Sequence, residues 1–194
     1  MPSPPPDGRR VRGDATRTAV ARAAADLATI QGLDSISVSQ LATATGVSKS
    51  GILTVFPNRE AIQIAAVAGA RHVYIDAVIR PGYAADPGRP RLRALVAAWV
   101  AYLQADTFPG GCFLAAASVE YGHRRGPVAE AVRALKREWL AVLEAEFAVA
   151  GSADPVTDAF RLDALLEAGN NRRGLFWDDA ELDRARDLAL ELIG

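Results

Sequence analysis

The residues best suited to chemistry in this chain are basic and hydroxyl side chains between positions 37 and 59. Lys49 and Arg59 are candidate partners for phosphate. Arg59 falls in the first turn of an expected helix, whose free backbone amides also attract an anion. The alternative for each residue is an ordinary helix cap or a solvated surface side chain. Nearby residues are suited to touch phosphate as caps (Ser37, Ser48) or to read base edges and a thymine methyl (Ser50, Gly51, Thr54).

A catalytic or metal site has few residues to draw on. Cys112, Glu120 and His123 form the only neighbouring set of a nucleophile and a base, and His72 is the only other histidine. Gly-Gly precedes Cys112 and Phe-Leu follows it, an apolar setting that raises the pKa of a thiol and leaves it inert. A single cysteine also excludes an intramolecular disulfide and a multi-cysteine zinc site. We therefore expect no enzyme activity, no metal and no cofactor.

Charge divides the chain into two unlike parts. The 194 residues carry a net charge of −1, which excludes a polycation built to coat nucleic acid. Residues 1–80 nevertheless hold nine Lys and Arg against six Asp and Glu, whereas residues 81–194 hold thirteen against seventeen. The basic part contains Lys49 and Arg59. The asymmetry indicates two tasks, one of which involves phosphate.

The spacing of apolar residues is helical throughout, and no segment alternates with a period of two. The pattern predicts an all-α protein of about nine helices with no sheet. Ser37 and Gln40 form a capping-box pattern before the second helix, and Gly46 suits the turn that follows it. The expected helices span about 16–30, 38–45, 49–56, 58–80, 91–106, 113–123, 127–149, 155–173 and 179–193.

Two segments rich in proline and glycine fall outside the expected helices. Residues 1–13 are expected to form a disordered basic arm, and residues 81–90 (PGYAADPGRP) a loop. The first of these has no apolar stretch of the kind found in a secretory signal. The sequence has no run of eighteen consecutive apolar residues, so that no transmembrane helix is predicted. We expect a cytoplasmic protein with no membrane partner.

The segment Val38–Phe56 (VSQLATATGVSKSGILTVF) has the spacing of a helix-turn-helix. Ala42 is small where two short helices would cross, Gly46 permits the turn, and Ile52 follows six residues later. This arrangement holds the second helix outward, so that its N-terminal half can enter the major groove of DNA. An ordinary helical hairpin has the same small and apolar residues, and the motif alone leaves both interpretations open.

The longer run Thr16–Ile64 resembles the N-terminal domain of the TetR/AcrR family of transcriptional regulators. The resemblance covers about fifty residues and includes GVSK before the second short helix and FPNREA after it. It implies a homodimer that binds a palindromic operator in double-stranded DNA, and it places Thr16 and Arg17 where family members contact the DNA backbone. Leu53 departs from the family, whose members often carry a backbone-contacting aromatic residue at that position.

The resemblance also implies a division of labour along the chain. Residues 14–60 would form the DNA-binding domain, a linking helix would run to about 80, and residues 81–194 would bind a small-molecule effector and a second copy. Effector pockets are mostly apolar, with a few polar groups that orient the ligand. The alternative for any one aromatic residue is the core. The candidate pocket residues are Trp99, Tyr102, Phe113, Glu120, Tyr121, His123 and Trp139.

The last two expected helices have apolar faces with small residues, which suits a four-helix interface between two copies. The alternative is that both faces are buried within one chain. The candidate interface residues are Leu162, Leu165, Leu166, Gly169, Leu182, Ala185, Leu188 and Leu192.

These features together predict a DNA-binding transcriptional regulator, most simply a repressor that a small, largely apolar effector releases from its operator. The alternative is a dimeric helical protein that binds a ligand and has lost specific DNA binding. The departure at Leu53 and Val55 gives that alternative some weight.

Overall fold

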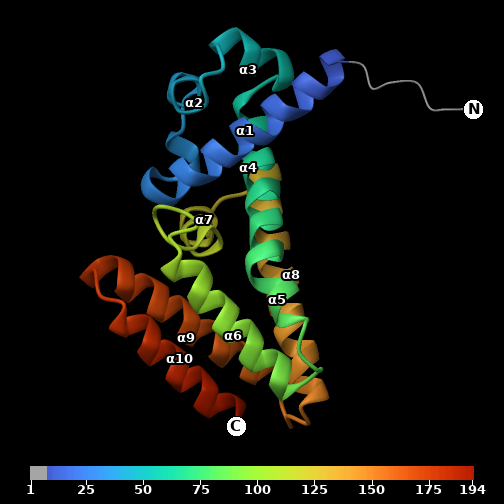
Figure 1. Ribbon diagram of the computed structural model, residues 1–194, viewed down its shortest axis with the longest axis vertical. Helices are drawn as coiled ribbons and strands as arrows, with labels where there is room; N and C mark the ends of the chain where they lie inside the picture. The colour runs from blue at the N-terminus through green and yellow to red at the C-terminus, as the bar shows by residue number, and fades with distance from the viewer. Residues whose placement is uncertain (1–7) are drawn as a thin grey trace, which may run out of the picture.

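The molecule is an elongated stack of helices (Figure 1). The computed structural model describes residues 8–194, and these residues contain no β-strand, which confirms the all-α prediction. The elements are α1 (Gly8–Gln31), the 3-10 turn η1 (Leu33–Ser35), α2 (Val38–Thr45), α3 (Lys49–Val55), α4 (Arg59–Tyr74), the π turn η2 (Ile75–Ile79), α5 (Arg80–Gly82), α6 (Arg89–Gln104), α7 (Phe113–Tyr121), α8 (Pro127–Val149), α9 (Pro155–Phe176) and α10 (Ala180–Ile193).

The helices are arranged in two tiers. α1, α2 and α3 form one end of the molecule, and α6, α9 and α10 form the other (Figure 1). α4 and α8 run lengthwise between the ends, and α7 lies where the two tiers meet. Because α4, η2 and α5 follow one another without a break as the helical run Arg59–Gly82, the described residues form nine helices besides the turn η1.

Capping explains where the two short helices begin and end. The Ser37 hydroxyl accepts a hydrogen bond from Gln40 N–H at 3.2 Å, and Gln40 Oε1 accepts one from Ser37 N–H at 2.8 Å. Gly46 follows α2 in the left-handed conformation at φ 70°, which glycine adopts without steric cost. The Ser48 hydroxyl accepts a hydrogen bond from Gly51 N–H at 3.1 Å and so caps α3. The predicted capping box and turn are confirmed.

The expected disordered arm is wrong for residues 8–13, which belong to α1. Arginine is a good helix former, and one internal glycine, Gly13, costs only about 1 kcal/mol relative to alanine. Asp14 and Arg17 stabilise the same part of α1 with an ion pair of 3.0 Å at i and i+3. The remainder of the predicted arm, residues 1–7, lies outside the described residues.

The predicted loop at 81–90 is shorter than expected at both ends. The helical run continues through Pro81 and Gly82, and α6 already begins at Arg89. The π turn η2 precedes Pro81, with Arg80 N–H donating to the Ile75 carbonyl, and such turns adjust a helix around a residue that lacks an N–H. At Gly82 a Cβ atom would lie 2.4 Å from the Leu95 side chain, so that glycine permits the close approach of α5 to α6.

α9 and α10 form a hairpin whose inner seam is buried within one chain. Five of the eight candidate interface residues are buried within one chain, namely Leu162, Leu166, Gly169, Leu182 and Ala185. Leu165 and Leu192 are half-buried, and Leu188 is 43% exposed. At Gly169 a Cβ atom would lie 2.5 Å from the Cβ of Ala185, which shows how closely the two helices approach. The apolar stripes seen in the sequence are therefore mostly buried within one chain, and a different face of the two helices points outward.

One hydrophobic core connects both tiers. It runs from Val20 in α1 and Ile52 in α3 through Tyr74 to Leu182 in α10. The helical run Arg59–Gly82 is long and apolar enough to cross a membrane by length and composition alone. The core helix of a soluble protein meets the same criterion, and this run contributes buried side chains to the shared core.

Candidate nucleic-acid interface and ligand cavity

The tip of the molecule presents the exposed face of α3. Leu41 and Ile52 are 1% and 0% exposed, and they fix α2 and α3 against the core beneath. Lys49, Leu53 and Thr54 are exposed on the outer side of α3. Lys49 forms no ion pair with any residue that the structure describes. Its ammonium group is therefore available to an anion outside the chain.

The small polar residues around α3 have clear local roles. Ser37 and Ser48 are helix caps, and the Ser48 and Ser50 hydroxyls lie 3.1 Å apart. Thr54 is exposed and donates its hydroxyl hydrogen to the Ser50 carbonyl at 2.8 Å. At Gly51 a Cβ atom would lie 3.1 Å from the Val47 side chain, so that this glycine serves close packing in the first turn.

The other predicted phosphate partners are already in contact with carboxylates. Arg17 is exposed and pairs with Asp14 at 3.0 Å, while Thr16 is half-buried. The Arg59 guanidinium lies 3.7 Å from Asp34, and its side chain is 52% exposed. Such exposed ion pairs contribute little to stability, so that the arginine can leave its carboxylate partner and bind a phosphate. Both arginines thus remain candidate phosphate contacts, each with an internal competitor.

Glu120, a candidate pocket residue, instead fastens α7 to the tip of the molecule. Its carboxylate accepts hydrogen bonds from Leu33 N–H at 2.6 Å and from Asp34 N–H at 2.8 Å. These two amides belong to η1, where no hydroxyl or amide side chain caps the turn. Gly32 precedes them at φ 86°, and a Cβ atom there would lie 3.3 Å from the Glu120 carboxylate. We call this arrangement of Glu120, Leu33 and Asp34 the α7 clasp.

Arg124 extends the α7 clasp by a charge network. Its guanidinium lies 2.9 Å from the Asp34 carboxylate and 5.0 Å from the centre of the Tyr121 ring. The hydrogen bond from Arg124 lowers the pKa of Asp34, which therefore stays ionised at neutral pH. Arg124 approaches Asp34 more closely than Arg59 does. The ion pair between Asp34 and Arg59 is therefore the weaker of the two.

A cavity of about 490 Å³ opens between the helical run Arg59–Gly82, which we call the linking helix, and α8. Helices α6 and α7 close its inner end. Most of the lining is apolar. The lining residues are Ala70, Arg71, Tyr74, Ile75, Ile79, Tyr83, Tyr102, Phe113, Leu114, Leu135, Glu138, Trp139, Ala141, Val142 and Ala145. Its size falls within the range of small-molecule sites.

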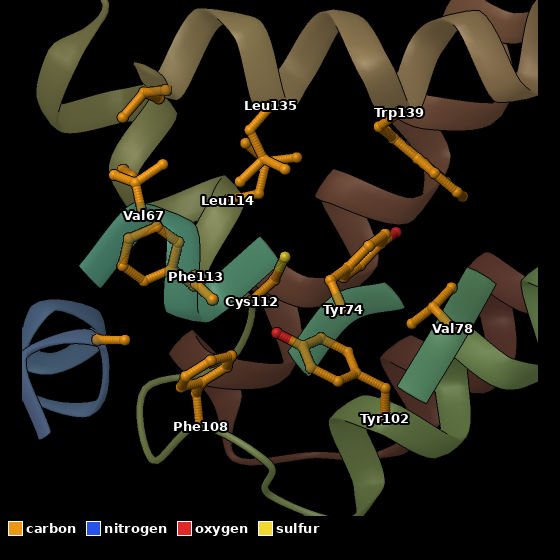
Figure 2. Close-up of a cluster of buried hydrophobic side chains, with 14 of the residues drawn as sticks. Val67, Tyr74, Val78, Tyr102, Phe108, Cys112, Phe113, Leu114, Leu135 and Trp139 are labelled. Carbon is orange, nitrogen blue, oxygen red and sulfur yellow. The ribbon is translucent and has the colours of Figure 1, made fainter. Parts of the chain in front are cut away.

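Edge-to-face aromatic rings form the floor of the cavity. The ring of Tyr74 packs against Tyr102 at 5.7 Å and against Trp139 at 5.4 Å, measured between ring centres. Figure 2 shows these three side chains converging from different helices, with Cys112 and Phe113 beside them. Burial raises the pKa of both tyrosines, so that their phenols are neutral at physiological pH. The indole N–H of Trp139 donates to Asp163 at 3.0 Å, which fixes the orientation of this ring.

Three of the seven candidate pocket residues line this cavity: Tyr102, Phe113 and Trp139. Trp99 is a core residue at 4% exposure, and His123 lies exposed after α7. Tyr121 is buried beside the α7 clasp rather than in the cavity. Sequence reasoning missed the wall that the linking helix supplies, including Tyr74, Ile75, Ile79 and the charged Arg71. The signal in the sequence is the apolar stripe of that helix, which continues to Ile79.

Cys112 is buried in the core beneath the cavity. Burial raises the pKa of its thiol, and its backbone N–H donates to Asn170 at 3.0 Å. Such a thiol is a poor nucleophile at neutral pH. Among residues 8–194, no group of three or more His, Cys, Asp or Glu side chains is arranged to hold a metal ion.

Comparison with known proteins settles the family. Residues 88–189, more than half of the chain, match the family model of the tetracyclin repressor-like C-terminal domain. The chain belongs to the TetR family of transcriptional regulators. The match covers the α6–α10 part of this TetR-family protein and complements the resemblance of the run Thr16–Ile64.

Solved structures share the whole fold of this TetR-family protein. A TetR regulator from Chloroflexus aurantiacus has a TM-score of 0.86 at 20% identity, covering 94% of this chain and 96% of its own. A TetR-family regulator from Cytophaga hutchinsonii has a TM-score of 0.82 at 21% identity, covering 94% of each chain. AibR, solved with isovaleryl coenzyme A and operator DNA, has a TM-score of 0.71 at 17% identity over 92% of this chain and 98% of its own. No curated protein matches the sequence.

Proposed function

We propose that this TetR-family protein is a cytoplasmic homodimer that binds a palindromic DNA operator through α3 and represses transcription. The observation that carries the proposal is the capped α2–α3 unit, which holds the unpaired Lys49 outward at the tip of the molecule. Residues 14–60 form the DNA-binding domain, the linking helix continues to about 80, and residues 81–194 bind effector and partner. AibR supports the combination of DNA binding and small-molecule binding in one protein, because it was solved together with operator DNA and isovaleryl coenzyme A.

The DNA contacts are proposed residue by residue. Lys49 and Arg59 neutralise phosphates, with further backbone contacts from Thr16, Arg17 and the caps Ser37 and Ser48. Ser50 and the methyl group of Thr54 contact base edges. Gly51 has no side chain and so lets the bases approach the backbone of the first turn of α3. Because few of these side chains are strong base readers, the spacing of two half-sites, about 34–36 Å or a multiple, contributes much of the specificity.

The cavity between α4 and α8 is the proposed effector site. A small, largely apolar molecule would fill it, with Tyr102, Phe113 and Trp139 among its contacts. Release from DNA follows from a population shift, in which the effector prefers the conformer whose α3 helices are badly spaced. Two elements connect the cavity to the tip: α4 leads directly to α3, and α7 begins at the cavity with Phe113 and ends at the α7 clasp with Glu120.

The second copy is proposed to pack on the outward face of α9 and α10. This face carries exposed apolar or small residues at helical spacing, which differ from the seam residues buried within the chain: Phe160, Ala164, Ala168 and Leu175 on α9, and Leu188 on α10. Phe160 and Leu175 are 69% and 67% exposed. Large apolar side chains in a row on a helix surface mark an interaction site.

The function is tested by fluorescence anisotropy with labelled double-stranded DNA from the region beside the protein's own gene. We expect saturable binding. An unlabelled, unrelated duplex of the same length should compete at least about a thousandfold less well than the unlabelled specific duplex. Equal competition by the unrelated duplex would contradict the proposal and favour the alternative, a dimeric ligand-binding protein without specific DNA binding. The exposed Leu53 in place of an aromatic residue is the observation that keeps this second candidate in view.

A further inference from the structure

The cavity contains only one pair of opposite charges. Arg71 of α4 and Glu138 of α8 both line it, and the Arg71 Nε lies 2.6 Å from the Glu138 Oε2. The two side chains are 43% and 53% exposed, which places the pair where the cavity meets solvent. The pair also joins the helix that leads to α3 with the helix on the opposite wall. Any molecule that enters the cavity passes an arginine and a carboxylate that already neutralise each other.

The other charged groups near the cavity are committed elsewhere. Arg91 lies 4.4 Å from the centre of the lining Tyr83 ring, but its guanidinium pairs with the buried Glu146 at 2.9 Å. Glu146 also accepts a hydrogen bond from Gly88 N–H at 2.7 Å. Asp163, behind Trp139, is bound by Lys136 at 2.6 Å. None of these charges is free to receive a charged group from a ligand.

The interior offers no substitute partner for a charge. Apart from Arg71 and Glu138, every lining side chain is aliphatic or aromatic, and the two buried tyrosines are neutral phenols. A ligand carboxylate would have to take Arg71 from Glu138, and a ligand ammonium would have to take Glu138 from Arg71. Either exchange breaks a short ion pair beside an apolar cavity, and because the pair is half-exposed the cost is modest rather than that of a buried charge. An uncharged ligand leaves the pair intact.

We propose that the Arg71–Glu138 pair selects uncharged effectors, and that each member of the pair alone would select a ligand of the opposite charge. This inference rests on the proposed role of the cavity as the effector site. The effector class is therefore a neutral molecule with an aromatic ring and few polar groups. The ring packs against Tyr74 and Trp139, and a neutral polar group faces the paired charges.

The test uses three probes that share one ring system and differ in charge: 1-naphthalenemethanol, 1-naphthoate and 1-naphthalenemethylammonium. Binding to the full chain is measured by isothermal titration calorimetry at pH 7. We expect the wild-type protein to bind the neutral probe about fivefold more tightly than either ion. Val142→Trp, which fills the cavity from its half-buried lining position, should abolish binding of the neutral probe and so locate it in the cavity.

Single substitutions should redirect the charge preference. Glu138→Gln leaves Arg71 unpaired and should make naphthoate the tightest of the three probes, whereas Arg71→Gln should favour the ammonium. Glu130→Gln is the matched control, because it breaks a 2.7 Å ion pair with Arg133 on the same helix but outside the cavity lining. It should leave the wild-type ranking unchanged. Circular dichroism spectra should match for all variants, since both members of the pair are half-exposed.

Two unfavourable outcomes are distinguishable. If the probes bind in the cavity with equal affinity, or if neither Glu138→Gln nor Arg71→Gln changes their ranking, the selective role of the pair is wrong and the effector site stands. If none of the three probes binds to the wild-type protein, both the charge selection and the proposed effector site are contradicted.

Discussion

At the scale of single residues, a basic side chain is a better candidate for phosphate binding when no carboxylate of the chain already pairs with it. Lys49 and Arg59 are both basic, yet only Arg59 has an internal carboxylate partner, Asp34 at 3.7 Å. An unpaired ammonium group gains a phosphate without losing an internal contact. We therefore rank Lys49 first among the proposed DNA contacts.

Lys49→Ala should weaken binding to the DNA beside the protein's own gene and reduce the slope of log K against log salt by about 1. The loss should be similar for specific and unrelated duplexes, because a phosphate contact carries no sequence information. Anisotropy titrations over a salt series measure both quantities. Arg80→Ala is the control, since it removes the same charge from α5 and should leave the slope unchanged. An unaltered slope in Lys49→Ala would remove this residue from the interface.

At the scale of elements, α7 connects the two tiers of the molecule. Its first residues line the cavity, and near its other end Glu120 caps η1 by two backbone hydrogen bonds of 2.6 and 2.8 Å. A carboxylate that accepts two amide hydrogens is a charge-assisted pair of bonds, which are stronger than neutral ones. α7 therefore connects the cavity to the tip, as α4 also does.

Glu120→Gln should destabilise the protein by about 2 kcal/mol, because an amide presents one oxygen where the carboxylate presents two. Urea unfolding measures the loss, and hydrogen exchange should accelerate at the Leu33 and Asp34 amides. Glu191→Gln makes the same change at an exposed position on α10 and should be neutral within about 0.5 kcal/mol. Equal unfolding midpoints for the two variants would show that the α7 clasp contributes nothing.

The α9–α10 seam gives a second prediction with a control on the same helix. Gly169→Ala places a methyl group 2.5 Å from the Ala185 Cβ and should cost about 1–3 kcal/mol. Gly174→Ala meets nothing within 4 Å and should stabilise α9 by about 0.5–1 kcal/mol. Both are compared by urea unfolding at one protein concentration, since dimerisation contributes to apparent stability. Two variants of equal stability would contradict the close seam.

The elements whose ends depend on local chemistry are the ones that the sequence predicts well. The Ser37 capping box and the Gly46 turn follow from side chains and backbone conformations within a few residues. The continuation of helix through Pro81 does not, because it depends on the π turn before it and on the contact of Gly82 with Leu95. Burial against distant helices decides the rest.

The candidate site also has features that depend on local sequence and features that depend on distant contacts. The exposed face of α3 follows from the spacing of the helix-turn-helix. The role of Glu120 does not follow from its neighbours in sequence, because its partners lie 86 and 87 residues away. The predicted set of lining residues is incomplete for the same reason. Arg71 and Tyr74 line the cavity, but the sequence predicts only a linking role for their helix. An apolar stripe alone also cannot separate the α9–α10 seam from a surface that binds a second copy.

At the scale of the whole molecule, two copies are needed to present two α3 helices to a palindromic operator. The proposed contact face of α9 and α10 is separate from the core, so that it can be altered without unfolding the chain.

Phe160→Arg should convert the dimer to a monomer, because Phe160 is 69% exposed within one chain and would be buried opposite the second copy. Light scattering after size exclusion should give twice the chain mass of 20.5 kDa for the wild-type protein and the single mass for the variant. Val149→Arg, at the exposed end of α8, should remain dimeric. A dimeric Phe160→Arg would place the interface elsewhere.

The coupling between the cavity and α3 is tested most directly by the distance between the two copies of the tip. Spin labels at Ser39→Cys, exposed on α2, report this distance by double electron–electron resonance in a Cys112→Ala background. We expect saturating 1-naphthalenemethanol to shift the mean distance by about 2 Å or more, because small movements at an effector site are amplified by packed helices. An identical distance distribution with the cavity empty and filled would contradict the proposed release mechanism.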